Sequence, residues 1–468
     1  MHIQSKIYTF AAFLRMNIIY LTSMKKLLLA VTAIAVTAGT AVAEGYQVNT
    51  FSARQEGMGH VGVALKLGAE SNIFNPGALA FSDKTVDVTA GMSAIKSSVT
   101  ANHNGTEYKT SNKVSTPFNI SAAFRIYDNL YAGVSMYTPY GSSINWGDNW
   151  AGAVLNQSVD LKIFTVQPTV SWRILPKLSI GAGLMVSWGS VDLHKALVSP
   201  SSLDRLLGAL GSDVRFGSIS PASVELTGSS DLSVGYNIGA MYEVTPRITI
   251  GASFRSKMQM KVSKGDAEVF YANQAAQKIL GNTLDNLNQT NFSAAMPCPY
   301  VLTFGVAYRP IDRLTLAFDA QLTGWKTYDY LDFSFDHLPD FDQHLSKKYH
   351  NSWTYHLGAE YALTDRLDLR AGLMVDQSPV NKNHYNPETP GMTKIEPSVG
   401  LSFRPVKSFS IDVAFMYVKG CGADNATGQY DDFIAKNYPQ LGLPSTGQFT
   451  ADYHLHAVIP AIGVRYAF

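Results

Sequence analysis

Apolar and polar residues alternate with a period of two along most of the chain. Residues 409–417, 367–375 and 314–322 each place large apolar side chains on one face and Ser, Asp, Gln, Gly or Ala on the other. A period of two indicates β-strands. Because the second face combines charged residues with Gly and Ala, it suits the lumen of a barrel better than the solvated face of a sheet.

The alternation recurs often enough to predict a closed, all-β architecture. We count fourteen runs, at residues 86–99, 113–125, 130–146, 159–174, 178–193, 223–243, 248–264, 297–309, 314–335, 352–363, 367–378, 394–404, 409–419 and 453–468. Outer-membrane barrels of bacteria have an even number of antiparallel strands, and roughly 9–11 residues cross the membrane. The sequence therefore predicts a 14-stranded antiparallel outer-membrane β-barrel.

The connections between these runs are of two kinds. Tight connections rich in Pro, Asp and Asn follow the even strands, at 127–129, 175–177, 245–247, 311–312, 364–366 and 406–407. Long connections follow the odd strands, at 100–112, 147–158, 194–222, 265–296, 336–351, 379–393 and 420–452. This strict alternation predicts periplasmic turns on one rim and extracellular loops on the other.

The N-terminal region has the pattern of a secretory signal peptide. Residues 24–26 are Met-Lys-Lys, an apolar run covers 27–36, and Ala-Val-Ala at 41–43 resembles a cleavage site. The alternative is a membrane anchor, but the apolar run is short for a span of about 20 residues. We therefore assign 24–43 to the signal peptide and interpret 1–23 as a misassigned upstream extension.

Composition narrows the class further. Charged residues make up only 16% of the chain, 24 Tyr and 23 Phe are present, and the net charge is +1. A balance this close to neutral gives no support for nucleic-acid binding. Of the two cysteines, Cys298 and Cys421, free thiols are the simpler interpretation, although both fall near one rim and a bridge between them stays open.

Residues 44–85 precede the first strand and do not alternate. Because a barrel of only about 8 strands already fills its interior with side chains, a wider barrel needs a filling, and we expect this segment to form a small plug in the lumen. Its motifs are Gly-Tyr-Gln-Val-Asn at 45–49, the Gly-rich stretch 57–64, and Asn75, Pro76 and Gly77 followed by Ala and Leu. Together with the strand count, they resemble the FadL/TodX family of outer-membrane transporters for hydrophobic compounds, in which Asn-Pro-Ala stands where this chain has Asn-Pro-Gly.

The resemblance implies a function and a route. It implies outer-membrane transport of hydrophobic small molecules, with long-chain fatty acids as the first expectation and monoaromatic hydrocarbons as the alternative. Family members release ligand sideways through an inward kink of the third strand, and here that strand contains Pro139 and Gly141. Proline removes a ladder donor and glycine adds freedom, so these residues are candidates for the lateral gate. The alternative is that the strand ends at Pro139, above the membrane.

Two long loops carry helical stripes that fit the expected capture site. The candidate groove residues are Leu203, Leu206, Leu207, Leu210, Ile279 and Leu280. Exposed apolar helices are unfavourable unless they pack together or bind something, so mutual packing and ligand contact both stay open.

Arginines recur on the inward face near the turn rim, namely Arg125, Arg173, Arg309, Arg404 and Arg465. Salt bridges to Glu56 or Glu70 of the plug are one interpretation, because a buried guanidinium needs partners. The other is that one of them holds the carboxylate of a fatty acid.

Rival functions have weaker support. An outer-membrane enzyme needs a positioned nucleophile and base, and no such motif stands out; His454 and His456 alone do not indicate a metal site. A hydrophilic porin would not need residues 44–85 as a plug, and an adhesin would show repeats in its loops. We therefore expect a monomeric transporter without a cofactor or metal, surrounded by outer-membrane lipid. The aromatic terminus, Tyr466 and Phe468, resembles the signal read by the barrel-assembly machinery.

Overall fold

The computed structural model describes residues 45–468, so the expected signal peptide (24–43) and upstream extension (1–23) lie outside it. Fourteen antiparallel strands pair in a closed ring, and the first strand pairs with the last. In ring order they are β1 (Val86–Ser93), β4 (Phe118–Tyr127), β5 (Leu130–Asn145), β6 (Ser158–Leu175), β7 (Leu178–Ala196), β9 (Ser233–Thr245), β10 (Ile248–Arg255), β13 (Val301–Ile311), β14 (Leu314–Thr323), β17 (Ser352–Ala362), β18 (Leu367–Asp376), β19 (Lys394–Val406), β20 (Phe409–Gly420) and β22 (Thr446–Ala467). The predicted 14-stranded barrel is confirmed.

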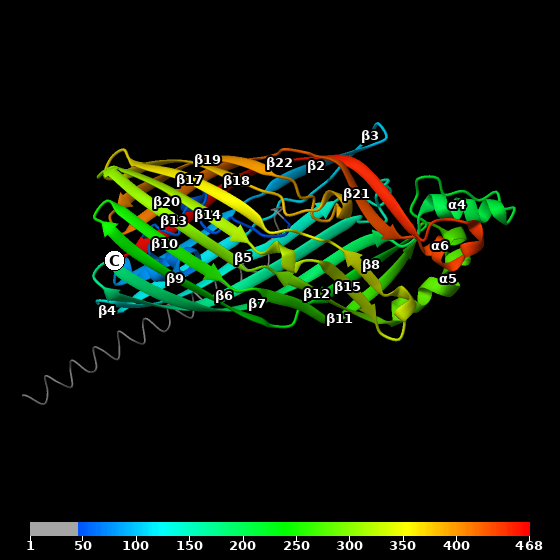
Figure 1. Ribbon diagram of the computed structural model, residues 1–468, viewed down its shortest axis with the longest axis horizontal. Coiled ribbons are helices and arrows are strands. Elements are labelled where there is room, and N and C mark those ends of the chain that lie inside the picture. The colour runs from blue at the N-terminus through cyan, green and yellow to red at the C-terminus, as the bar shows by residue number, and fades with distance from the viewer. Residues whose placement is uncertain (1–44) are drawn as a thin grey trace, which may run out of the picture. The chain divides into compact units, whose positions relative to one another are not determined.

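Five predicted strands are broken in two, which the alternation alone did not reveal, and their additional parts are β2 (Lys96–His103), β8 (Ala222–Ser229), β11 (Met258–Tyr271), β12 (Asn291–Cys298) and β15 (Tyr330–Phe335). Three more strands lie in segments predicted as loops, namely β3 (Thr106–Lys109), β16 (Gln343–Ser346) and β21 (Ala423–Asp431). Beyond the breaks the neighbours keep their order, since β8 pairs with β7 and β11, and β12 with β11 and β15. The wall therefore continues past the barrel as an extension on the loop side (Figure 1).

The wall is apolar outside and polar inside. Outward-facing residues such as Val170, Ile238 and Leu357 are exposed, whereas their inward-facing neighbours, such as Ser171 and Asn237, are buried. This inversion of the soluble pattern is that of a barrel surrounded by lipid.

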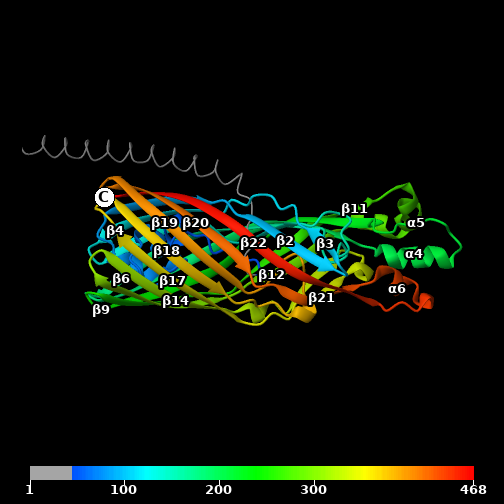
Figure 2. The ribbon, with the colours of Figure 1, turned by 90° about the horizontal axis from the view of Figure 1, so that it is seen from above.

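Helices occupy the loop rim and the N-terminal segment. The loop helices are α4 (Pro200–Ala209), α5 (Gln274–Leu284) and α6 (Phe433–Asn437), with the short turns η3 (Asp285–Gln289), η4 (Trp325–Thr327), η5 (Pro339–Phe341), η6 (Lys382–His384) and η7 (Pro439–Leu441). The helices α4, α5 and α6 gather at the end of the barrel opposite the C-terminus (Figures 1 and 2). In residues 45–468, no helix has the length and hydrophobicity needed to cross a membrane.

Residues 45–85 lie inside the ring. They form α2 (Ala53–Glu56), η1 (Gly68–Glu70), α3 (Ser71–Phe74) and η2 (Pro76–Phe81). The amide of Gly62 donates to Asp319 of β14 at 2.7 Å, and Asn72 donates to the carbonyl of Ala122 of β4 at 3.1 Å. Because β14 and β4 stand opposite each other in the ring, the segment crosses the lumen.

Candidate functional site

An apolar cavity lies at the level where the loop-side extension begins. It draws on strands from both sides of the ring. Its apolar lining is Tyr46, Val159, Leu161, Ile163, Val191, Leu193, Met260, Val262, Ala294, Met296, Tyr328, Leu331 and Phe333. Such a lining suits a small ligand with a large apolar surface.

Tyr46, near the start of the N-terminal segment, lines this cavity and also contacts the neighbouring wall strand β5. Its ring packs edge-on against Trp325 at 4.9 Å and Tyr328 at 5.4 Å, and its hydroxyl donates to the carbonyl of Pro297. Its own carbonyl accepts from the amide of Gly141 at 2.8 Å. A ligand that displaced Tyr46 would therefore disturb β5 directly.

One buried ion pair lies next to the cavity. Nζ of Lys347 lies 2.5 Å from Oε1 of Glu388, and both side chains are buried. Glu388 borders the cavity, whereas the lysine is paired with it. A ligand carboxylate would have to compete with Glu388 for this lysine, so the pair is a poor anion site.

The ladder between β4 and β5 ends inside the wall. The last pair joins Asn119 to Tyr137, although β5 continues to Asn145. Beyond it, the edge of β5 pairs with the N-terminal segment, since the amide of Val48 donates to the carbonyl of Pro139 at 2.9 Å. Between Pro139 and Gly141, the edge of β5 therefore pairs with residues 46–48 of the N-terminal segment and not with β4, which leaves a gap in the β4–β5 ladder.

The two gate residues proposed from the sequence both lie at this gap. Pro139 falls in a register irregularity of the β5–β6 ladder between Tyr137 and Tyr140, and Gly141 follows it. Pro139 cannot donate to a neighbouring strand, so an interrupted ladder suits it. The alternative that β5 ends at Pro139 is wrong, because the strand extends six residues further.

A second chamber, lined mostly by polar residues, lies between the N-terminal segment and the wall. Arg255, at the end of β10, borders it and is only 9% exposed. Its guanidinium stacks over Phe51 at 5.3 Å and Tyr137 at 5.9 Å, and its Nε has no hydrogen-bond partner. Within residues 45–468, no carboxylate lies at ion-pair distance from Arg255. A buried cation without a counter-ion is costly, which makes this side chain a candidate anion ligand.

Two other titratable groups border the chamber, and buried atoms of both, namely Oδ1 of Asp319 and the ring nitrogens of His60, have no hydrogen-bond partner among residues 45–468. Oδ2 of Asp319 accepts the amides of Gly62 and Val63 at 2.7 and 3.0 Å, so this carboxylate holds the N-terminal segment. Burial, with His356 nearby, lowers the pKa of His60 to about 3. His60 is therefore neutral at pH 7, and Arg255 supplies the positive charge of the chamber.

The five arginines proposed from the sequence do not line the apolar cavity or the polar chamber. Arg404 and Arg465 pair with Asp368 and Asp87, both at 2.7 Å, so their partners are barrel aspartates and not Glu56 or Glu70. The other three lie at the turn rim: Arg125 is exposed and donates to Thr85, Arg173 donates to the carbonyl of Asp128, and Arg309 borders an open hollow.

The loop helices bury most of their apolar stripes. Leu203, Leu206, Leu207 and Leu280 are buried. Only Leu210, 72% exposed, and Ile279, 38% exposed, face outward. Oγ of Ser202 donates to Asp432, the N-cap of α6, which ties α4 to α6. Mutual packing therefore accounts for four of the six proposed groove residues.

The Asn-Pro-Gly motif fastens the N-terminal segment to the wall. Nδ2 of Asn75 donates to the carbonyls of Val63 and Ala240 at 2.7 and 2.9 Å, and Oδ1 accepts the amide of Gly77 at 3.0 Å. The wall has a glycine, Gly239, where the motif contacts it. No larger residue fits at this position, because a Cβ on Gly239 would lie 2.1 Å from Oδ1 of Asn75.

Cys298 is buried, Cys421 is exposed, and both are free thiols. Tyr466 and Phe468 lie exposed on the outer wall at the turn rim, with their rings 5.5 Å apart.

Comparisons with known proteins agree with this architecture. The sequence model of the outer membrane protein transport protein family (OMPP1/FadL/TodX) matches residues 34–468. Outer membrane protein P1 of Haemophilus influenzae is 24% identical over 421 residues, which cover 83% of this chain and 89% of that protein. The long-chain fatty acid transport protein of Escherichia coli is 21% identical over 436 residues, which cover 85% of this chain and 93% of that protein.

Solved structures show the same fold. A Pseudomonas aeruginosa FadL homologue superposes with a TM-score of 0.75 at 19% identity, covering 91% of this chain and all of that one (100%). The Pseudomonas putida toluene transporter TodX gives a TM-score of 0.66 at 16% identity, covering 89% of this chain and 98% of that one. The chain therefore belongs to the outer membrane protein transport (OMPP1/FadL/TodX) family, whose members are outer-membrane β-barrels that carry hydrophobic compounds.

Proposed function

We propose that this protein carries long-chain fatty acids through the outer-membrane wall by lateral release between β4 and β5. The observation that carries the proposal is Arg255, a buried guanidinium without a counter-ion that borders a polar chamber beside the gap. A carboxylate is the group that a guanidinium recognises best, through two parallel hydrogen bonds. The apolar cavity would hold the alkyl tail before the acid moves toward the gap.

The route begins at the loop rim. Leu210 and Ile279 are the exposed apolar residues of the two helical stripes, so we assign initial capture to them. The acid then enters the apolar cavity, whose floor is Tyr46. Displacement of Tyr46 would loosen its bond to Gly141 and expose the edge of β5.

Arg255 acts at the last stage of the route. Its guanidinium lies 5.9 Å from the ring of Tyr137, the residue at which the β4–β5 ladder ends. A carboxylate held there would lie beside the gap while the tail passes between the strands. Residues 45–85 would act as the plug that keeps water and hydrophilic solutes out of the lumen, and the chain would function as a monomer.

The test is uptake of labelled oleate by cells that lack their own transporter and produce this protein or its variants. Arg255→Met keeps an unbranched flexible side chain and removes the charge, and Arg125→Met is the matched control at the exposed rim. We expect Arg255→Met to lower oleate uptake at least tenfold, because a hydrogen bond to a charged group contributes about 1.5–3 kcal/mol. Toluene, which has no carboxylate, should enter both variants alike.

The outcomes separate the parts of the proposal. Equal loss of oleate and toluene uptake in Arg255→Met would assign Arg255 a packing role and contradict carboxylate recognition. Background oleate uptake by the unmodified protein, shown to be folded in the outer membrane, would exclude fatty acids. Monoaromatic hydrocarbons, carried by the similar toluene transporter TodX, are the second candidate, and the nearly uniform apolar lining of the cavity favours them.

The lateral exit has its own test. A disulfide between cysteines introduced at Phe118 and Thr138, which lie across from each other on the same face of the wall, with the native cysteines replaced by serine, would pin β4 to β5 at the lower end of the gap. We expect oxidation to block oleate uptake and reduction to restore it. Uptake that is insensitive to oxidation of a bridge shown to have formed would contradict exit at this position.

A further inference from the structure

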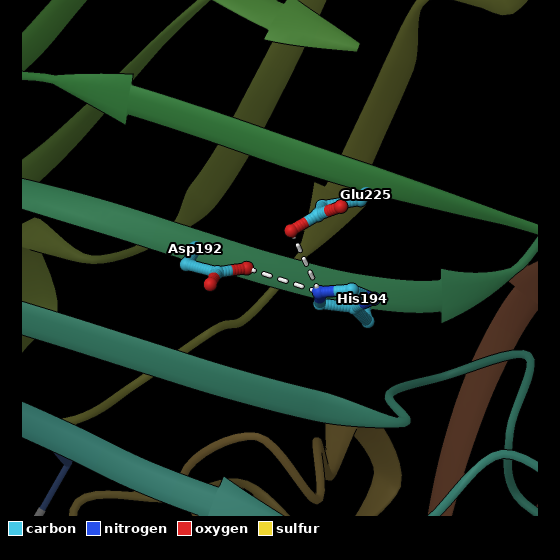
Figure 3. A group of neighbouring side chains, drawn as sticks. All are labelled: Asp192, His194 and Glu225. Carbon is cyan, nitrogen blue, oxygen red and sulfur yellow. Dashed lines mark ion pairs between the residues drawn. The ribbon is translucent and has the colours of Figure 1, made fainter. Parts of the chain in front are cut away.

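Three metal-ligating side chains meet on the outer wall of the loop-side extension (Figure 3). Asp192 and His194 stand two residues apart on β7, so they share one face, and His194 lies directly opposite Glu225 in the β7–β8 ladder. Nε2 of His194 is 3.2 Å from Oδ1 of Asp192 and 3.1 Å from Oε1 of Glu225. All three ligand atoms lie within 4.8 Å of one another.

This site lies beyond the apolar band of the wall. Outward-facing Trp188 of β7 packs against Phe164 of β6 with ring centroids 6.2 Å apart, and aromatic residues of this kind mark the edge of the membrane. Asp192 follows Trp188 by four residues on the way to α4. The three side chains are therefore accessible to ions from the aqueous side.

Protein hydrogen bonds do not satisfy the cluster. Oδ1 of Asp192 is shielded from solvent, yet it has no hydrogen-bond partner among residues 45–468, although it lies close to Nε2. Both carboxylates converge on the same ring nitrogen, which carries at most one proton. One proton on His194 therefore cannot serve both acids.

The spacing matches the edges of a metal coordination shell. Zinc binds imidazole nitrogen and carboxylate oxygen at about 2.0–2.2 Å, so neighbouring ligand atoms of a tetrahedral site are roughly 3.4 Å apart. The two measured contacts, 3.1 and 3.2 Å, are close to this value. One imidazole with two carboxylates favours zinc and related ions over magnesium or calcium, which prefer oxygen alone.

The surroundings add negative charge that the protein does not balance. Asp160 of β6 stands directly across from Asp192, and Glu268 of β11 stands directly across from Glu225. Like charges in these positions destabilise a sheet. Lys162 pairs with Asp160 at 2.9 Å, but among the described residues no lysine or arginine pairs with Asp192, Glu225 or Glu268. A divalent cation would relieve this repulsion.

We propose that Asp192, His194 and Glu225 bind one zinc-type divalent cation, with water as the fourth ligand. β7 leads into α4 and β8 leads out of it, so the cation ties together the two stems of the α4 loop. The site would thereby hold α4 in place at the loop rim. It is independent of the transported ligand.

The test is metal binding by the mature protein, purified in detergent without a polyhistidine tag and stripped with a chelator. Zinc is titrated calorimetrically, and cobalt(II) reports the geometry through its visible absorption. The variants are His194→Ala and Glu225→Ala. The matched control is His344→Ala, because His344 pairs with a single carboxylate, Asp332, at 2.5 Å and has no third ligand.

We expect one equivalent of zinc, an intense tetrahedral cobalt spectrum, and at least about tenfold weaker binding in both site variants, since even outer-shell changes weaken metal sites by this amount. His344→Ala should bind like the unmodified protein. Hydrogen exchange of residues 197–221 should slow when zinc is added. Two results would overturn the proposal and indicate adventitious surface binding only. One is equal zinc affinity in the unmodified protein and His194→Ala, and the other is an equal loss of affinity in His194→Ala and His344→Ala. Circular dichroism verifies that each variant is folded.

Discussion

Replacing Asn75 with alanine tests how the N-terminal segment is held in the barrel. The side chain is fully buried and makes three hydrogen bonds, to Val63, Gly77 and Ala240. Each contributes about 1 kcal/mol net, so Asn75→Ala should weaken the segment's attachment by about 3 kcal/mol. Since about 1.4 kcal/mol corresponds to a factor of ten, the open population should rise roughly 100-fold.

Hydrogen exchange followed by mass spectrometry measures this directly. We expect amide protection across residues 45–85 to fall by roughly two orders of magnitude in Asn75→Ala, while the barrel strands keep theirs. Asn383→Ala, an exposed asparagine of a loop, is the control and should leave protection unchanged. Cells should also become more permeable to hydrophilic antibiotics. Unchanged protection in Asn75→Ala would refute the assignment of the motif as the anchor.

Three further predictions concern the same barrel. Burial raises the pKa of Glu56 to about 8, with Glu396 contributing, so the folded state holds this proton more tightly than the unfolded chain. Its stabilising contribution is present below about pH 4.5 and is lost as the pH rises through about 8, and Glu56→Gln should flatten this dependence of thermal stability. Gly181→Val should displace the motif, because a Cβ there would lie 2.4 Å from the backbone of Pro76, and protection of residues 45–85 should fall. Deletion of Phe468 should lower the amount of folded protein in the outer membrane, measured by quantitative blotting of membrane fractions, if the terminus is the assembly signal.

The strand count and the two rims were predictable because each strand buries one face and exposes the other to lipid. The breaks within strands were not, because alternation continues across them. Arg255 is the last residue of β10, where one of these breaks begins. Inside the predicted run 248–264, the pattern did not distinguish it from other charged residues of the inner face. Its significance comes from the lack of a carboxylate at ion-pair distance within residues 45–468, which no sequence pattern reports.

The candidate site was predictable only where backbone chemistry carried the signal. Pro139 and Gly141 mark the gap because a missing donor must be accommodated somewhere in the ladder. The partners of the proposed arginines could not be predicted, because the periodicity gives the face of a strand and not the residue across from it. Arg465, for example, pairs with Asp87, which is 378 residues away in the sequence. Likewise, Glu225 reaches His194 only because α4 turns the chain back on itself.

The closure of the ring by β1 and β22 imposes an order on assembly. Residues 45–85 are made before all of the wall strands and run directly into β1, whereas β22, which completes the wall by pairing with both β1 and β20, is the last strand to be made. Whatever lies in the lumen must therefore be enclosed at the moment when the seam forms. The seam between β1 and β22 therefore joins the strand that directly follows residues 45–85 to the last strand of the ring.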